Sequence, residues 1–146
     1  MIRVVVVDDL PVVRTGLRKF LSLADDIEVV GTAANGQAAL QLVTSTQPDV
    51  VLMDVEMPVL DGVAATKEIR QQHPHVQVVL LTMFDNDRYV LNGLQAGAVS
   101  YLLKDAEDAE VISAIRSAAA GQSILIPVQP QRLLHILLLI RCQLLN

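Results

Sequence analysis

The chain has 146 residues, of which 52% are hydrophobic and 18% charged, and its formal net charge is −5. The apolar share excludes a chain that is disordered overall, and the acidity argues against direct binding of nucleic acid. A single cysteine, Cys142, excludes an internal disulfide and fits a reducing compartment. We find no signal-peptide pattern and no apolar run long enough to span a bilayer, so we expect a cytoplasmic protein without membrane contact.

Short apolar runs alternate along the chain with stretches whose apolar residues recur at helical spacing. The runs are Ile2–Val7, Ile27–Ala33, Val50–Asp54, Val76–Thr82 and Val99–Leu103. The first helical stretch places Val12, Val13, Leu17, Phe20 and Leu21 on one predicted face. Five successive strand–helix units predict the α/β class, a doubly wound parallel sheet with helices on both faces.

Three carboxylates stand at strand ends. Asp8 and Asp9 directly follow the first run, and Asp54 closes the third. In a five-stranded sheet of order 2-1-3-4-5, the ligand crevice lies between strands 1 and 3, so these acids should meet there. Each close pair would repel by about 4 kcal/mol at an effective dielectric near 20. A divalent cation removes that cost, which packing alone does not justify.

The predicted crevice also receives a hydroxyl and an ammonium group. Thr82 ends the fourth run and Lys104 follows the fifth. Three carboxylates with these two groups suit a phosphoryl group carried on a carboxylate. Asp54 is the predicted nucleophile, Lys104 pairs with phosphate oxygens, and Thr82 donates a hydrogen bond to another oxygen.

The same acids form the predicted metal site. Asp8, Asp9 and Asp54 would hold Mg²⁺, a hard cation that takes few carboxylates and keeps several waters. A backbone carbonyl beyond the third strand, that of Glu56, would complete the coordination. The side chain of Glu56 is expected to face solvent.

These residues lie in an order that resembles the receiver domain of two-component response regulators over residues 2–121. The matching positions are Asp8-Asp9, Asp54, Met57-Pro58, Asp61-Gly62, Thr82 and Lys104. The resemblance implies a flavodoxin-like receiver fold, phosphotransfer from a sensor histidine kinase to Asp54, and dependence on Mg²⁺. It describes a phosphoacceptor signalling domain, and not an enzyme beyond its own phosphorylation and dephosphorylation.

A finer resemblance points to the LuxR-type (NarL/FixJ-like) regulators of transcription. It is carried by Val13-Arg14, Gly16-Leu17, Leu81-Thr82-Met83, Gly97-Ala98 and the segment 101–105. Two positions depart from the wider pattern. Asp105 follows Lys104 where many receivers have proline, so we expect a trans peptide there. Leu10 stands where close relatives often have a polar residue or histidine.

The resemblance also implies a switch. Thr82 moves toward the phosphate, Tyr101 turns from exposed to buried, and the surface from residue 85 to residue 120 changes, which would permit a homodimer. Met83 and Phe84 follow Thr82. Their bulk could slow hydrolysis of the acyl phosphate; the alternative is that both simply pack under the fourth helix.

Residues 122–146 form an apolar extension. Its fixed charges are Arg132 and Arg141, too few for a nucleic-acid footprint. The DNA-binding domain into which LuxR-type relatives continue is absent from this sequence. We expect a buried helix from about Pro130. Three interpretations stay open: a helix docked on the receiver, a helix that dimerises, or the remnant of a linker.

Two other functions would place similar residues at strand ends. A phosphohydrolase of the haloacid dehalogenase type would use Asp8 as nucleophile, but it needs an Asp-x-Asp pair and a large cap domain. A flavin or nucleotide binder would need a Gly/Ser/Thr-rich loop, where this chain has Asp8-Asp9-Leu10-Pro11. His73 and His75 flank Pro74 and lack partners for a metal site.

Overall fold

The structure is a computed structural model that describes residues 1–83, 87–121, 138 and 141. Strands and helices alternate along it. They are β1 (Ile2–Val7), α1 (Pro11–Leu21), β2 (Ile27–Ala33), α2 (Gly36–Thr46), β3 (Val50–Asp54), α3 (Gly62–Gln72), β4 (Gln77–Thr82), α4 (Asp87–Gln95), β5 (Ser100–Leu103) and α5 (Asp108–Ala119).

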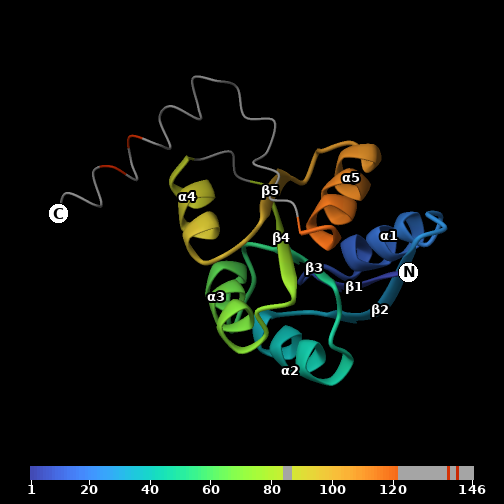
Figure 1. Cartoon of the computed structure of the whole chain (residues 1–146), viewed down its shortest axis with the longest axis horizontal. Helices are drawn as coiled ribbons and strands as arrows, with labels where there is room; N and C mark the ends of the chain where they lie inside the picture. Colours follow the sequence, from blue (N-terminus) through green and yellow to red (C-terminus); the bar gives the residue numbers. More distant parts are fainter. Residues whose placement is uncertain (84–86, 122–137, 139–140, 142–146) are drawn as a thin grey trace.

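The five strands form one parallel sheet in the order β2-β1-β3-β4-β5. Helices α2, α3 and α4 cover one face of the sheet, and α1 and α5 cover the other (Figure 1). The predicted fold class and strand order are therefore confirmed. The strand order reverses at β1, so the crevice between β1 and β3 opens at the carboxyl ends of these two strands.

The central strands are buried on both faces, which explains their unbroken apolar runs. Val5 and Val7 pack into the cluster beneath α2, α3 and α4. Val4 and Val6 pack into the opposite cluster, with residues of α1 and α5. Helices on both faces thus hold the ends of β1 and β3 in place.

Side-chain caps start the helices that follow β2 and the β3–α3 loop. Asn35 Oδ1 accepts a hydrogen bond from the Ala38 N–H at 2.8 Å, and Asp61 Oδ1 accepts one from the Ala64 N–H at 2.8 Å. Such a cap stabilises a helix by about 1 kcal/mol. In contrast, Leu10 at the N-cap of α1 makes no side-chain cap.

Helix α1 differs from the prediction at its first turn. Val12 is 77% exposed and does not belong to the buried face on which we placed it. The helical repeat explains the error, because Val12 shares its face with Gly16 and Lys19, which are also exposed. Leu17, Phe20 and Leu21 do pack into the core.

The predicted helix from Pro130 lies outside the described residues, apart from two positions. Leu138 and Arg141 are helical and exposed. Within the described part of the chain, none of the helices combines the length and the hydropathy needed to cross a bilayer.

Candidate functional site

The three predicted carboxylates meet at the carboxyl ends of β1 and β3. Val7 pairs with Met53 across these strands, so Asp8 and Asp54 follow at neighbouring positions. Each of Asp8, Asp9 and Asp54 offers an oxygen within 4.8 Å of the others. Asp8 is 1% exposed and Asp54 5%, whereas Asp9 is open to solvent. Two of the three acids in the site are thus buried, and Asp9 is accessible to solvent.

Lys104 enters the same crevice from the end of β5. Its Nζ lies 2.9 Å from Asp8 Oδ2 and 3.3 Å from Asp54 Oδ2. Its backbone N–H donates to the Thr82 carbonyl at 2.7 Å, which ties the ends of β5 and β4 together. Burial alone would lower the pKa of Lys104, but the hydrogen bond to Asp8 and the charge of Asp54 outweigh it and raise the pKa. The ammonium therefore stays charged and offsets part of the repulsion.

Burial raises the pKa of Asp54 to about 6, and the negative charge of Asp8 contributes further. Lys104 acts in the opposite direction without cancelling these effects. Asp54 is therefore largely ionised at neutral pH, as a nucleophilic carboxylate must be, and becomes protonated below about pH 6.

Asp8 is held through its backbone as well as its side chain. Its N–H donates to the Ala33 carbonyl at 3.1 Å, and its own carbonyl accepts a 2.6 Å hydrogen bond from the Arg14 guanidinium. Asp8 Oδ1 accepts from the Leu10 N–H at 3.0 Å. From the sequence, Arg14 was expected only as part of a family motif, with no role at the site.

The loop between β3 and α3 is pinned to its surroundings by backbone hydrogen bonds. The Gly62 N–H donates to the Val55 carbonyl at 2.8 Å, and the Gly36 N–H donates to the Leu60 carbonyl at 3.0 Å. Within this loop the Glu56 N–H donates to Asp54 Oδ1 at 3.4 Å, and the Glu56 side chain is exposed. The loop that carries the predicted fourth ligand is thus held close to Asp54.

The two predicted switch residues are buried. Thr82 ends β4, one residue beyond the Leu81 that pairs with Asp54, and is 1% exposed. Tyr101 on β5 is 2% exposed, and its ring lies against α4, where a Cβ at Gly93 would be 3.2 Å from Tyr101 Cδ2. Tyr101 thus occupies the position that the resemblance assigns to the phosphorylated form.

Expectations from the sequence also covered the packing of Met83 and Phe84 and the peptide bond after Lys104. Met83 is 73% exposed, so the alternative that it packs under α4 is wrong. Phe84 lies outside the described residues. The peptide bond between Lys104 and Asp105 is trans, as expected.

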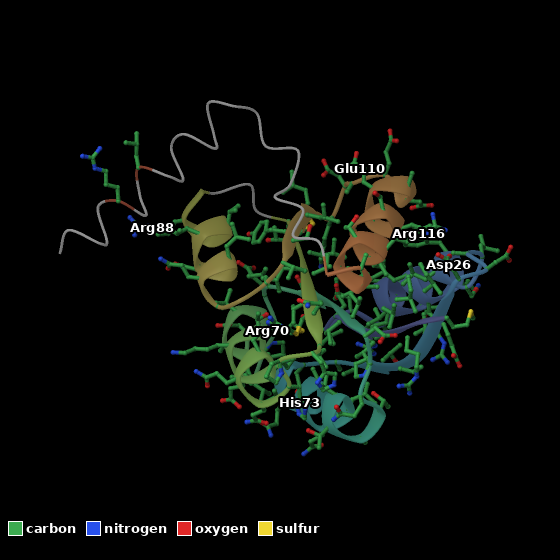
Figure 2. All side chains as sticks on the ribbon, in the orientation of Figure 1. Asp26, Arg70, His73, Arg88, Glu110 and Arg116 are labelled. Carbon is green, nitrogen blue, oxygen red and sulfur yellow. The ribbon has the colours of Figure 1, made fainter. Side chains whose placement is uncertain are left out.

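The two histidines near the α3–β4 turn contact neighbouring side chains. His73 follows α3 (Figure 2). Its ring nitrogens lie 3.2 Å from Thr44 Oγ1 and 3.3 Å from Gln47 Nε2, so both are already engaged. The His75 ring packs edge-on against that of His73, with centroids 6.2 Å apart.

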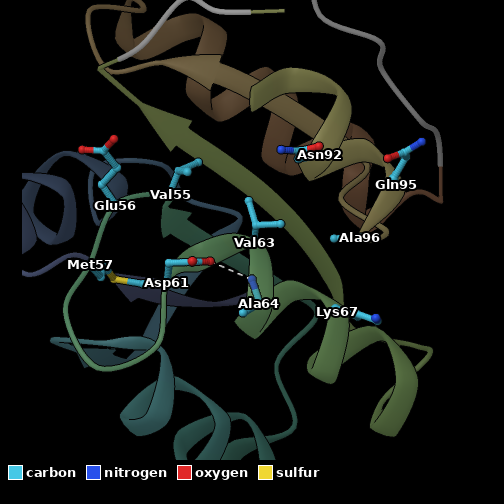
Figure 3. A pocket seen from close by; sticks show the side chains of 10 residues that line it. All are labelled: Val55, Glu56, Met57, Asp61, Val63, Ala64, Lys67, Asn92, Gln95 and Ala96. Carbon is cyan, nitrogen blue, oxygen red and sulfur yellow. Dashed lines mark hydrogen bonds between the residues drawn. The ribbon is translucent and has the colours of Figure 1, made fainter. Parts of the chain in front are cut away.

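A groove of about 680 Å³ lies beside the acid cluster, between α3 and α4. Figure 3 shows Glu56 and Asp61 at its loop side and Asn92 and Gln95 on α4. Asp8, Asp9 and Asp54 are not among its lining residues. The sequence did not indicate this groove, because it depends on how two successive helices are placed side by side on the sheet.

Residues 4–116 match the family model of the response regulator receiver domain. The chain is 46% identical over 123 residues to the uncharacterized transcriptional regulatory protein YxjL of Bacillus subtilis (strain 168), covering 84% of this chain and 56% of that protein. It is 44% identical over 133 residues to the response regulator GacA of Pseudomonas viridiflava, covering 91% and 62%. The chain therefore spans less than two thirds of the length of these relatives.

Solved structures agree with the sequence relatives. The signal receiver domain of a NarL response regulator from Mycobacterium tuberculosis superposes with a TM-score of 0.80 at 39% identity, covering 83% of this chain and 98% of that chain. A LuxR-family two-component response regulator from Aurantimonas sp. SI85-9A1 gives 0.82 at 33% identity, covering 92% and 94%. The chain belongs to the response regulator receiver domain family of two-component systems, and its relatives are regulators of the LuxR type.

Proposed function

We propose that this receiver accepts a phosphoryl group on Asp54 from a sensor histidine kinase in the cytoplasm, with Mg²⁺ held at the acid cluster. The observation that carries the proposal is the meeting of a buried Asp54 with Asp8, Asp9 and Lys104 at one strand edge. Phosphorylation would then change a surface for protein contact, through which the full-length regulator would control transcription.

The donor set fits Mg²⁺. Three carboxylates each offer an oxygen within 4.8 Å of the others, and the charge of the buried Asp8 is balanced by the Lys104 ammonium, 2.9 Å from Asp8 Oδ2. Asp8, Asp9 and Asp54 would hold the ion together with the Glu56 carbonyl. When bound, Mg²⁺ neutralises developing charge on the phosphoryl oxygens.

The chain's own residues carry the transfer. An Asp54 carboxylate oxygen attacks phosphorus, the new O–P bond replaces the N–P bond of the kinase phosphohistidine, and the histidine nitrogen keeps the released electron pair. Lys104, which is paired with Asp8 and Asp54 before the reaction, is placed to follow a transferred phosphate oxygen. Thr82, on the strand beside β3, would donate a hydrogen bond to another oxygen.

The site of labelling tests the proposal. Whole protein incubated with a small acyl phosphate and Mg²⁺ should gain one phosphate on Asp54, mapped by mass spectrometry, and Asp54→Asn should gain none. Phosphate on Asp8 would instead indicate chemistry of the haloacid dehalogenase type. Absence of labelling in the presence of Mg²⁺ would contradict a receiver active in phosphotransfer.

We further propose that residues 1–121 act as the receiver unit and residues 122–146 as a separate extension. Dimer contacts would come from the face formed by α4, β5 and α5 or from the extension. The acidic net charge of −5 supports protein contact over direct nucleic-acid binding by this chain.

A further inference from the structure

Arg14 reaches back from α1 to the loop that bears the acids. Its guanidinium donates to the Asp8 carbonyl at 2.6 Å and is partly buried. The bond spans six residues and joins the first turn of α1 to Asp8, the first residue after β1. Because the donor is charged, this hydrogen bond is of the stronger class.

The contacts of Asp8 divide into two kinds. Its carboxylate contacts, the Leu10 N–H and the Lys104 ammonium, involve the oxygens that a cation would need. Its backbone contacts, to the Ala33 carbonyl and to Arg14, leave those oxygens free to act as ligands. Arg14 can therefore hold Asp8 in the same orientation whether or not a cation is bound.

Besides the bond from the Leu10 N–H to Asp8 Oδ1, the start of α1 lacks the side-chain cap that would set the position of this loop. Leu10 at the N-cap has no side chain that can cap the helix, and the first turn carries no acid. Asp9 and Leu10 are both exposed. The bond from Arg14 thus links the body of α1 to the strand end through a side chain.

We propose that Arg14 is a positioning residue for the cation site: it fixes the Asp8 backbone so that the Asp8 carboxylate meets those of Asp9 and Asp54. This inference rests on the proposed Mg²⁺ site. A second effect acts on Mg²⁺ binding in the opposite direction, because the guanidinium charge by itself repels a cation. If positioning dominates, loss of Arg14 weakens Mg²⁺ binding; if repulsion dominates, loss of Arg14 strengthens it.

Calorimetric titration of the whole protein with Mg²⁺ separates these outcomes. Arg14→Met keeps an apolar stem without a donor, and we expect its Kd to rise about tenfold, the scale on which loss of an outer hydrogen bond weakens metal sites. Arg14→Lys keeps a charged donor and should recover part of the affinity. Arg18→Met, one turn further at an exposed position of α1, is the matched control and should bind like the parent.

A second measurement distinguishes positioning from a general loss of structure. The rate of phosphorylation by a small acyl phosphate, followed against Mg²⁺ concentration, should show a raised half-saturating concentration in Arg14→Met and the parental rate at saturation. A lowered saturating rate with unchanged half-saturation would overturn the proposal. So would a Kd for Arg14→Met equal to or below that of the parent.

Arg14→Gln provides a second loss variant should Arg14→Met fail to fold, and a parental Kd in that variant would equally overturn the inference. Failure of the proposed function itself looks different. In that case the parent would bind no Mg²⁺, whereas failure of the Arg14 inference leaves the parent binding normally.

Discussion

Asp54 is buried beside the negatively charged Asp8, and the pH dependence of stability measures the free-energy cost of ionising it there. Its pKa is raised to about 6 in the fold, from 3.8 in the unfolded chain. A carboxyl with a raised pKa stabilises the fold at low pH, and this contribution disappears as pH rises through about 6. The loss is at most on the order of 3 kcal/mol.

Asp54→Asn should therefore be more stable than the parent at pH 7 without Mg²⁺, by about 1–3 kcal/mol, because it removes the buried charge beside Asp8. Urea unfolding at several pH values measures the difference. The advantage should shrink toward pH 5, where the parent carboxyl is itself mostly protonated. An advantage that stays constant across this range would assign the effect to packing and not to charge.

Met83 follows Thr82 directly and is 73% exposed, so its side chain is open to solvent next to the end of β4. We expect Met83→Ala to shorten the half-life of the phosphoryl group several-fold, because less bulk would shield the acyl phosphate from water. Loss of label over time measures it. Leu23→Ala removes a side chain that is 83% exposed just beyond α1, and it should leave the half-life unchanged. Equal half-lives for Met83→Ala and the parent would remove the shielding role.

At the scale of elements, the start of α3 packs closely against the end of β3. A Cβ at Gly62 would lie 2.2 Å from the Asp54 carbonyl oxygen, which is backbone and cannot move aside. This close approach places the loop that carries Glu56 against the site. By contrast, a Cβ at Gly16 in α1 would meet nothing within 4 Å.

The two glycines should therefore respond to alanine with opposite signs. Gly62→Ala should destabilise the fold by more than about 2 kcal/mol and lower Mg²⁺ affinity, because the overlap displaces either α3 or the Asp54 backbone. Gly16→Ala should stabilise it by about 0.5–1 kcal/mol through helix propensity. Thermal and urea unfolding report both changes. Parental stability in Gly62→Ala would show that the approach of α3 to β3 is not rigid.

At the scale of the whole molecule, ion pairs and packed side chains join elements that are distant in sequence. Arg116 on α5 forms a bidentate pair with Asp26 ahead of β2, at 2.8 and 2.9 Å (Figure 2). Both side chains are about half exposed, so water and salt screen the pair and it adds little to the stability of the fold. Under the proposed function, the phosphorylation signal would pass through the buried residues Thr82 and Tyr101 to the face of α4, β5 and α5.

Thr82→Ala tests that coupling. We expect the variant to take up phosphate on Asp54 but to lose most phosphorylation-dependent dimerisation, because the phosphate would then favour one conformation less strongly. Light scattering with and without an acyl phosphate measures the dimer. The same measurement on a chain that ends at Gly121 shows whether the extension contributes. Equal dimerisation in Thr82→Ala and the parent would contradict the proposed switch.

Some features follow from local patterns in the sequence. Apolar runs of this kind mark buried strands, and polar residues appear where each strand ends at the edge of the sheet. This pattern predicts that Asp8, Asp54, Thr82 and Lys104 stand at strand ends. The observed strand order and the meeting of the three acids agree with these predictions. The spacing of apolar residues is a local property of the sequence, and in a regular fold it directly determines where each strand and helix lies.

Other features were decided only by packing. The Arg14 bond to the Asp8 carbonyl, the shared Lys104 ammonium and the groove between α3 and α4 depend on side-chain directions and on distances between elements. The raised pKa of Asp54 depends on how much water the surrounding helices exclude. These quantities arise from contacts across the fold, which no spacing along the chain encodes.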